Sequence, residues 1–119
     1  MSAWRVKAMF VLCCLGTLSL PAGASEAEIE FLLQAIGQSD CTFYRNGKAY
    51  SSSDAEAHLR MKYNRTRKRV KTADQFIDRL ASKSFLSGNA YSMQCARAET
   101  VPTQPWLQRT LGDYPRQAP

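Results

Sequence analysis

The chain has 119 residues and a formal net charge of +6, enough for one small domain with a basic surface. It has no glycine-rich phosphate loop, no G-x-S-x-G motif and no H-E-x-x-H motif, which excludes the enzyme classes that these motifs mark. We expect no cofactor. We also expect no metal site, because one histidine and few cysteines do not make a convincing zinc centre.

The N-terminal segment has the features of a secretory signal peptide. Arg5 and Lys7 form a short positive region, and the apolar run over 8–20 is too short to span a bilayer. Ala22 and Ala24 then give an A-x-A site, so we expect cleavage after Ala24 and a periplasmic location. An uncleaved membrane anchor is the alternative. The mature chain contains no further candidate transmembrane segment, and its formal charge falls to +4 because Arg5 and Lys7 are removed.

The mature chain is expected to begin with a helix from Ser25 to about Ser39. Ser25 can cap this helix, since a serine side chain accepts a hydrogen bond from a free N–H of the first turn. Its buried stripe recurs at helical spacing and comprises Ile29, Leu32, Leu33 and Ile36.

A β-hairpin is predicted over 41–50. Asn46-Gly47 is the strongest two-residue hairpin signal, because a type I′ turn needs positive φ at both central residues. This turn pairs Phe43 with Tyr50 and puts both on a core face with Cys41. A lone hairpin is marginal in water, so a further strand or a helix must complete it.

Two helices are expected after the hairpin. Ser53 and Glu56 have the spacing of a capping box, and the helix that follows runs to about Lys71. Thr72 can cap a second helix, from Ala73 to about Ser82. The predicted inward faces comprise Ala55, Leu59, Tyr63, Thr66 and Val70 in the first helix and Phe76, Ile77 and Leu80 in the second.

The last elements are a strand and a helix. Apolar alternation predicts a strand over Ala90–Cys95, and Thr103 can cap a final helix. Trp106 on that helix is either a core residue or a platform for a ligand. The elements predict a small single α+β domain over residues 25–114, with a three-stranded antiparallel sheet covered on one side. Residues 115–119 are expected to be a disordered tail.

Cysteine usage predicts one disulfide. Cys13 and Cys14 lie in the signal peptide, so the mature chain keeps only Cys41 and Cys95. An even pair in an exported protein indicates a disulfide, and closing a loop of about 55 residues contributes roughly 4 kcal/mol in the chain-entropy model. A reactive thiol is the alternative, but it requires a reduced cysteine in an oxidising compartment.

His58 is the only histidine and lies on the predicted polar face of the helix, one turn after Asp54. It is a candidate general base or anion contact. The alternative is a solvated histidine bonded to Asp54, which we favour because no nucleophile lies near it in the sequence.

A basic run follows His58 within twelve residues that contain no acid. On a continuous helix these side chains would surround the apolar face and attract anions. A solvated helix face is the alternative. With His58, the candidate anion-binding or partner-binding residues are Arg60, Lys62, Arg65, Arg67, Lys68, Arg69 and Lys71.

A series of segments resembles a family of small exported bacterial proteins known as domain of unknown function 5329. The resemblance runs from about Ile29 to Tyr114, and the family pattern includes Cys41, Cys95 and His58. It implies no established activity, substrate or catalytic residue. The segments are C-T-F-Y-R-N-G-K-A-Y, A-E-A-H-L-R-M-K-Y, R-V-K-T-A-D-Q-F-I-D-R-L-A-S-K-S, L-S-G-N-A-Y-S-M-Q-C and P-W-L.

The sequence therefore favours a non-catalytic periplasmic binding module. Its cationic helix face would meet an anionic envelope component or a protein partner, and nucleic acid is not expected in that compartment. One alternative is a small envelope enzyme with a site around His58. The other is a structural accessory of another envelope protein.

Overall fold

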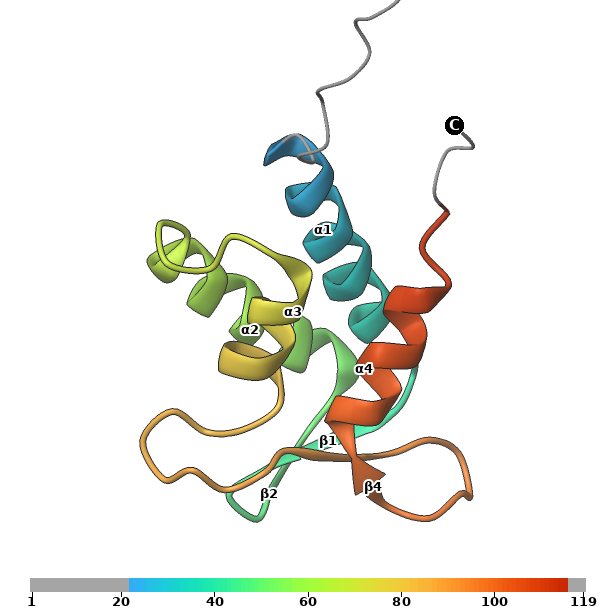
Figure 1. Ribbon diagram of the computed structural model, residues 1–119. Helices are drawn as coiled ribbons and strands as arrows, with labels where there is room; N and C mark the ends of the chain where they lie inside the picture. The colour runs from blue at the N-terminus through green and yellow to red at the C-terminus, as the bar shows by residue number, and fades with distance from the viewer. Residues whose placement is uncertain (1–21, 116–119) are drawn as a thin grey trace, which may run out of the picture.

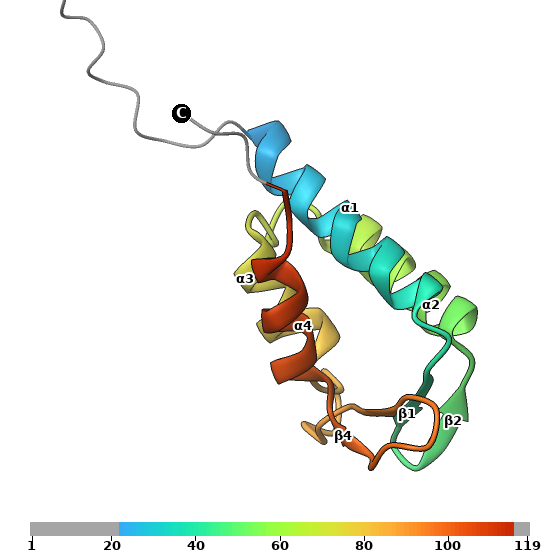
Figure 2. The same ribbon diagram turned by 90° about the vertical axis from the view of Figure 1, so that its right-hand side faces the viewer.

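An antiparallel sheet lies at one end of the molecule, and the helices stand on one side of it (Figures 1 and 2). The computed structural model describes residues 22–115, which form an α+β fold with four helices and a four-stranded sheet. Most of the predicted signal peptide and the predicted tail beyond Pro115 lie outside the described residues.

Helix α1, Ala22–Gln38, supplies the centre of the core. Its predicted stripe is confirmed, because Ile29, Leu32, Leu33 and Ile36 are at most 1% exposed. The predicted cap is wrong. The residues before Ser25 are already helical, so Ser25 has no first turn to cap. After the helix Asp40 has a φ of 59°, a conformation that aspartate tolerates better than most residues, and the chain turns there into the sheet.

The predicted hairpin is confirmed by strands β1, Thr42–Arg45, and β2, Lys48–Tyr50. Its register pairs Phe43 with Tyr50, as Asn46-Gly47 predicts. Asn46 and Gly47 have φ values of 52° and 80°, the two positive angles that a type I′ turn needs.

The sheet has one strand more than the sequence predicts. Its order is β2-β1-β3-β4, with β3 at Ser92–Gln94 and β4 at Val101–Pro102. Strand β3 pairs with β1, so the predicted third strand is confirmed. Strand β4 is not among the predicted elements. It has two residues and includes a proline at the sheet edge, so the sequence shows no alternation there.

Helix α2, Ser52–Thr66, begins and ends earlier than predicted. Its cap is Ser51, whose hydroxyl accepts from the Asp54 N–H, so the capping box at Ser53 is wrong. The helix does not continue to Lys71. The N–H groups of Arg69 and Val70 both donate to the Thr66 carbonyl, and this turn brings Val70 into the core at 3% exposure.

Helix α3, Ala73–Phe76, continues directly into a π-helical segment, η2, Ile77–Ala81. The predicted cap is confirmed, because the Thr72 hydroxyl accepts from the Gln75 N–H at 3.1 Å. The inward residues of this pair of elements are buried as predicted: Phe76, Ile77 and Leu80.

Helix α4, Thr103–Gly112, closes the core, and Leu107 is 1% exposed. The prediction that Thr103 caps this helix is wrong. Pro102 occupies the cap position, and the buried Thr103 hydroxyl lies 3.1 Å from the Ala81 carbonyl, to which it donates. Thr103 therefore ties α4 to η2.

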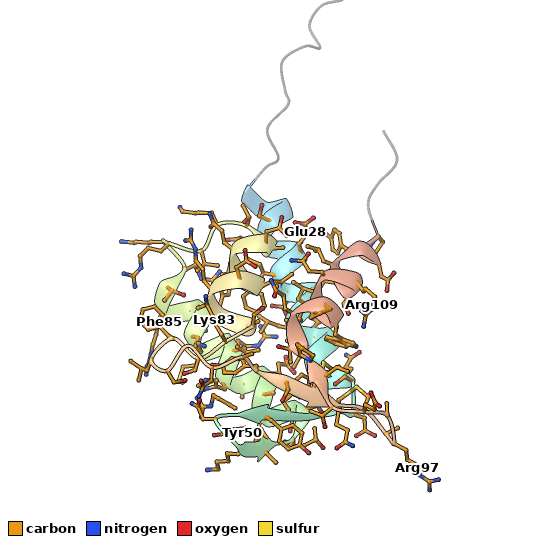
Figure 3. The ribbon with its side chains drawn as sticks, turned by 60° about the horizontal axis from the view of Figure 1, so that its bottom comes forward. Glu28, Tyr50, Lys83, Phe85, Arg97 and Arg109 are labelled. Atoms are coloured by element: carbon orange, nitrogen blue, oxygen red, sulfur yellow. A yellow bond between two sulfur atoms is a disulfide. The ribbon has the colours of Figure 1, made fainter. Side chains whose placement is uncertain are left out.

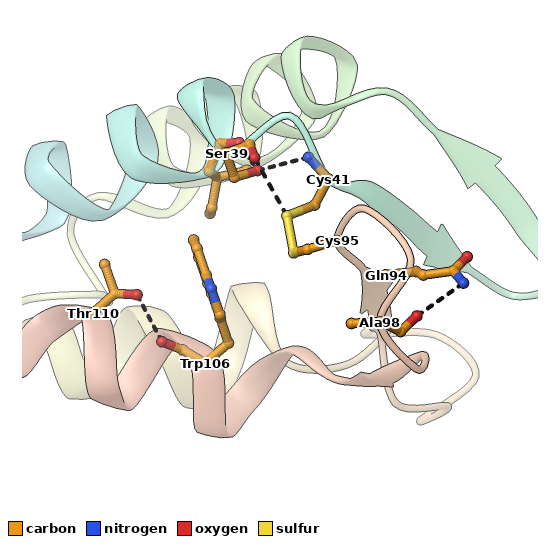
Figure 4. The surroundings of a disulfide bond; sticks show 8 residues. Ser39, Cys41, Gln94, Cys95, Ala98, Trp106 and Thr110 are labelled. Carbon is orange, nitrogen blue, oxygen red and sulfur yellow. Dashed lines mark hydrogen bonds between the residues drawn. A yellow bond between two sulfur atoms is a disulfide. The ribbon is translucent and has the colours of Figure 1, made fainter.

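The Cys41–Cys95 disulfide is present (Figure 4). It joins the residue before β1 to the residue after β3, across a sequence separation of 54. Trp106 lies beside it, half-buried against the core (Figure 4). This packing accords with the core interpretation of Trp106.

Candidate functional site

The seven cations of the basic run do not form one face. The structure separates them into an arginine held by acids, a lysine held inside the fold, and a group at the last turn of α2 and the turn that follows it. The last group is the largest, and we call it the basic corner: Arg65, Arg67, Lys68, Arg69 and Lys71.

Arg60 is paired with two carboxylates. Its Nη1 and Nη2 donate to Glu30 on α1 at 2.7 and 3.0 Å, and Nη2 also donates to Glu56 at 2.7 Å. Glu56 and Arg60 thus form an i,i+4 ion pair along α2. The hydrogen bonds from Arg60 lower the pKa of Glu30, and both acids raise the pKa of Arg60. Arg60 therefore links α1 to α2, and the two carboxylates compensate its charge, so it offers little attraction to a partner.

Lys62 points into the fold. Its Nζ donates to the Leu80 carbonyl at 2.9 Å and to the Tyr91 hydroxyl at 3.1 Å, and it lies 5.2 Å from the centre of the Tyr91 ring. These contacts connect α2 with η2 and with the segment that leads into β3. Lys62 is a structural cation.

The basic corner remains largely free. Arg67 alone has an acid, Glu26 at 3.7 Å, and it also covers the Tyr63 ring at 4.5 Å. Within residues 22–115, the other four side chains have no hydrogen bond or ion pair: Arg65, Lys68, Arg69 and Lys71. All five members are exposed and line an open cleft.

One cation reaches the basic corner from another element. Arg79 of η2 donates from Nη1 to the Arg69 carbonyl at 2.8 Å, which fixes the turn. The sequence gives no signal for this contact, because a ten-residue separation across a turn follows no helical or strand period.

His58 lies in a second, smaller site between α2 and the hairpin. Its Nε2 is 2.8 Å from Arg45 Nη1, and Arg45 Nη2 donates to the Tyr50 hydroxyl at 2.6 Å. A guanidinium can only donate, so Nε2 must accept and the ring proton lies on Nδ1. Burial, and then the charges of Arg45 and Lys62, lower the pKa of His58. The predicted partner Asp54 is wrong, because the hairpin brings Arg45 to the ring.

The cavity beside His58 is small and apolar. Its volume is about 40 Å³, room for no more than a few waters. Besides His58, its walls include Arg45, Tyr50, Tyr91 and Leu107. The sequence placed Tyr50 on the core face but gave no sign that these residues meet His58. With its acceptor nitrogen occupied by Arg45, His58 is arranged to hold the hairpin on α2.

No group of three potential metal-binding side chains occurs among residues 22–115. In the same part of the chain, no helix is both long enough and apolar enough to cross a bilayer.

The fold and these surfaces define a small α+β protein with one disulfide and an exposed basic corner. The chain belongs to the family described as "Family of unknown function (DUF5329)", whose model matches residues 23–115. It is 46% identical over 80 residues to the uncharacterized protein YfeK of Salmonella typhimurium strain LT2, an alignment that covers 62% of this chain and 67% of the relative. No solved structure matches the chain.

Proposed function

We propose that the protein is a non-catalytic binding module that holds an anionic partner at the basic corner. The observation that carries the proposal is the set of four exposed cations without a partner among the described residues: Arg65, Lys68, Arg69 and Lys71. Each of them has lost little hydration, and together they attract polyanions over about the 8–10 Å of a Debye length.

The surface differs from the cationic helix face that the sequence suggested. Arg60 and Lys62 are omitted because their charged groups already bond to other groups of the protein. His58 is omitted because Arg45 occupies its acceptor nitrogen. This bonding and the small cavity beside the ring favour binding over an enzyme site at His58.

The compartment is part of the proposal. The positive residues, short apolar run and A-x-A site of the N-terminal segment support export to the periplasm, where lipopolysaccharide, acidic phospholipids and acidic proteins are the available anions. N-terminal sequencing of protein recovered from the periplasm should begin at Ser25. Recovery of an intact chain in the membrane fraction would contradict the cleavage.

The binding test compares two variants of equal net charge. Arg65→Gln with Lys68→Gln changes the basic corner, whereas Arg97→Gln with Arg109→Gln changes exposed cations elsewhere on the surface (Figure 3). Affinity for heparin and for lipopolysaccharide should fall about tenfold in the first variant, if each exposed cation contributes on the order of 0.7 kcal/mol. Affinity should change by less than about threefold in the control.

Wild-type binding should also weaken steeply as salt is raised, because exposed charges are screened. An equal loss in both variants would show attraction by net charge alone and would overturn the basic corner as the site. Absence of any binding to either polyanion would overturn the proposal as a whole.

A further inference from the structure

The loop between η2 and β3 presents two large apolar side chains to solvent. Phe85 is 83% exposed and Leu86 is 94% exposed, the highest values among the large apolar residues that the structure describes. Figure 3 shows Phe85 and Lys83 at the same edge of the molecule. Single exposed apolar residues are common, but two adjacent ones at a loop tip indicate a surface that meets something apolar.

This loop is fixed, so the two side chains are held away from the core. The Ser84 N–H donates to the Asn89 carbonyl and the Gly88 N–H donates to the Ser84 carbonyl, each at 2.9 Å. The Ser87 hydroxyl and the Asn89 amide both donate to Asn46 Oδ1, at 2.9 and 3.2 Å. The loop is thereby attached to the turn of the β1–β2 hairpin.

The two attached segments carry positive charge and no acid. Residues 83–90 contribute Lys83, and the hairpin turn over 45–48 contributes Arg45 and Lys48. Lys48 and Lys83 are exposed. The basic corner lies on the same side of the molecule as this loop, toward the left of Figure 1. An apolar tip with flanking cations therefore lies on the same side of the molecule as the larger cationic surface.

We infer that the 84–88 loop inserts Phe85 and Leu86 into the surface of a bilayer that contains anionic phospholipid, while the lysines and the basic corner contact the headgroups. The inference rests on the proposed function, and it names the partner as a lipid surface. Apolar side chains that enter the acyl boundary beside basic residues are the usual features of peripheral membrane binding. Near an anionic bilayer each basic residue adds its own attraction to the surface potential.

A protein partner fits these observations less well. A stable protein interface buries roughly 800 Å² on each side, whereas this apolar surface consists of two adjacent side chains at a loop tip. Insertion into lipid needs no matching surface, because acyl chains rearrange around the inserted group.

The test measures sedimentation with vesicles of phosphatidylethanolamine and phosphatidylglycerol. The full chain is compared with a Phe85→Ser, Leu86→Ser variant and with Val101→Ser, which removes an exposed apolar side chain from β4. Any contribution of the N-terminal segment is the same in all three proteins. The double variant should lose about a hundredfold in vesicle affinity, about tenfold for each side chain, while the control stays within about threefold of wild type.

Heparin binding separates this inference from the proposed function. The double variant should keep its affinity for heparin, which offers charge but no apolar phase. As a direct readout of insertion, Phe85→Trp should add fluorescence that brominated phospholipids quench. The lipid inference would be overturned if the double substitution left vesicle binding unchanged, or if brominated phospholipids caused no added quenching. In either case, intact heparin binding would leave the proposed function standing. If the wild-type protein did not bind heparin at physiological salt, the result would count against the proposed function instead.

Discussion

The middle and the C-terminal end of α2 carry the same kinds of residue in different surroundings. In its middle turns the helix packs beside α1, and Arg60 there bonds to both Glu30 and Glu56 (Figure 2). At its C-terminal end the chain turns away, and the basic corner has one acid near it, Glu26. Glu26 is the first acidic residue of α1, so α1 has no further carboxylate to offer beyond that point.

This difference shows why a charge run in a sequence is not yet a binding surface. The run over residues 60–71 contains no acid, yet Arg60 within it is paired. Its partners come from the preceding turn and from another helix. The run also contains Lys62, whose partners come from later in the chain. Only where neighbouring elements supply no acceptor does the charge remain available to a ligand.

The largest expected effect is on the stability of the whole fold, which positions both parts of α2. Replacing Cys41 and Cys95 together by Ser should lower the free energy of unfolding by roughly 4 kcal/mol, because the unfolded chain regains the entropy of a long loop. Chemical denaturation of the variant measures this loss. Complete thiol labelling of the denatured, unreduced wild type would instead show that the disulfide is not formed in solution.

The next effect separates the inward and outward sides of α2. Leu59→Ala should cost about 2–5 kcal/mol, because Leu59 is buried and its removal leaves a cavity in the core. Met61→Ala, at an exposed position of the same helix, should stay within about 0.5 kcal/mol. Equal losses in the two denaturation curves would contradict the orientation of α2.

A smaller effect tests the contrast between the paired and the free arginines. Arg60→Gln should cost about 1 kcal/mol, since its bonds to Glu30 and Glu56 are partly exposed, whereas Arg65→Gln should cost less than about 0.5 kcal/mol. The folded-state pKa of Glu30 is lowered from 4.5. The part of the stability loss that comes from the Arg60–Glu30 pair should therefore be fully present above pH 4.5. That share should disappear as the pH falls through the lowered value. A cost that does not change with pH would contradict the carboxylate pairing.

The smallest effect concerns the second site. In an NMR titration the folded protein should show a His58 pKa below the ordinary 6.5, and Arg45→Gln should move it upward by removing a nearby charge. Since the neutral ring is favoured in the fold, the stability that His58 contributes is present above pH 6.5 and is lost as the pH falls through the lowered value. A pKa at or above 6.5 would show that His58 is not held against Arg45.

Local patterns in the sequence determined the elements whose causes lie within a few residues. Asn46-Gly47 specified the hairpin register, because the required backbone angles are a property of those two residues. Thr72 and Gln75 specified a helix start for the same reason. The predictions of the apolar stripe of α1 and of the disulfide were also correct. Burial shows in the sequence as apolar residues at helical spacing, and covalent pairing shows as an even number of cysteines.

The tertiary structure decided everything that depended on a partner distant in the chain. Strand β4 exists because β3 offers it a free edge, and α2 ends at Thr66 because Val70 is drawn into the core. His58 meets Arg45 rather than Asp54 because the hairpin packs on α2. The charge on Arg60 is taken up by α1, which no period along α2 could reveal, so the candidate site could be located only after the elements had been packed.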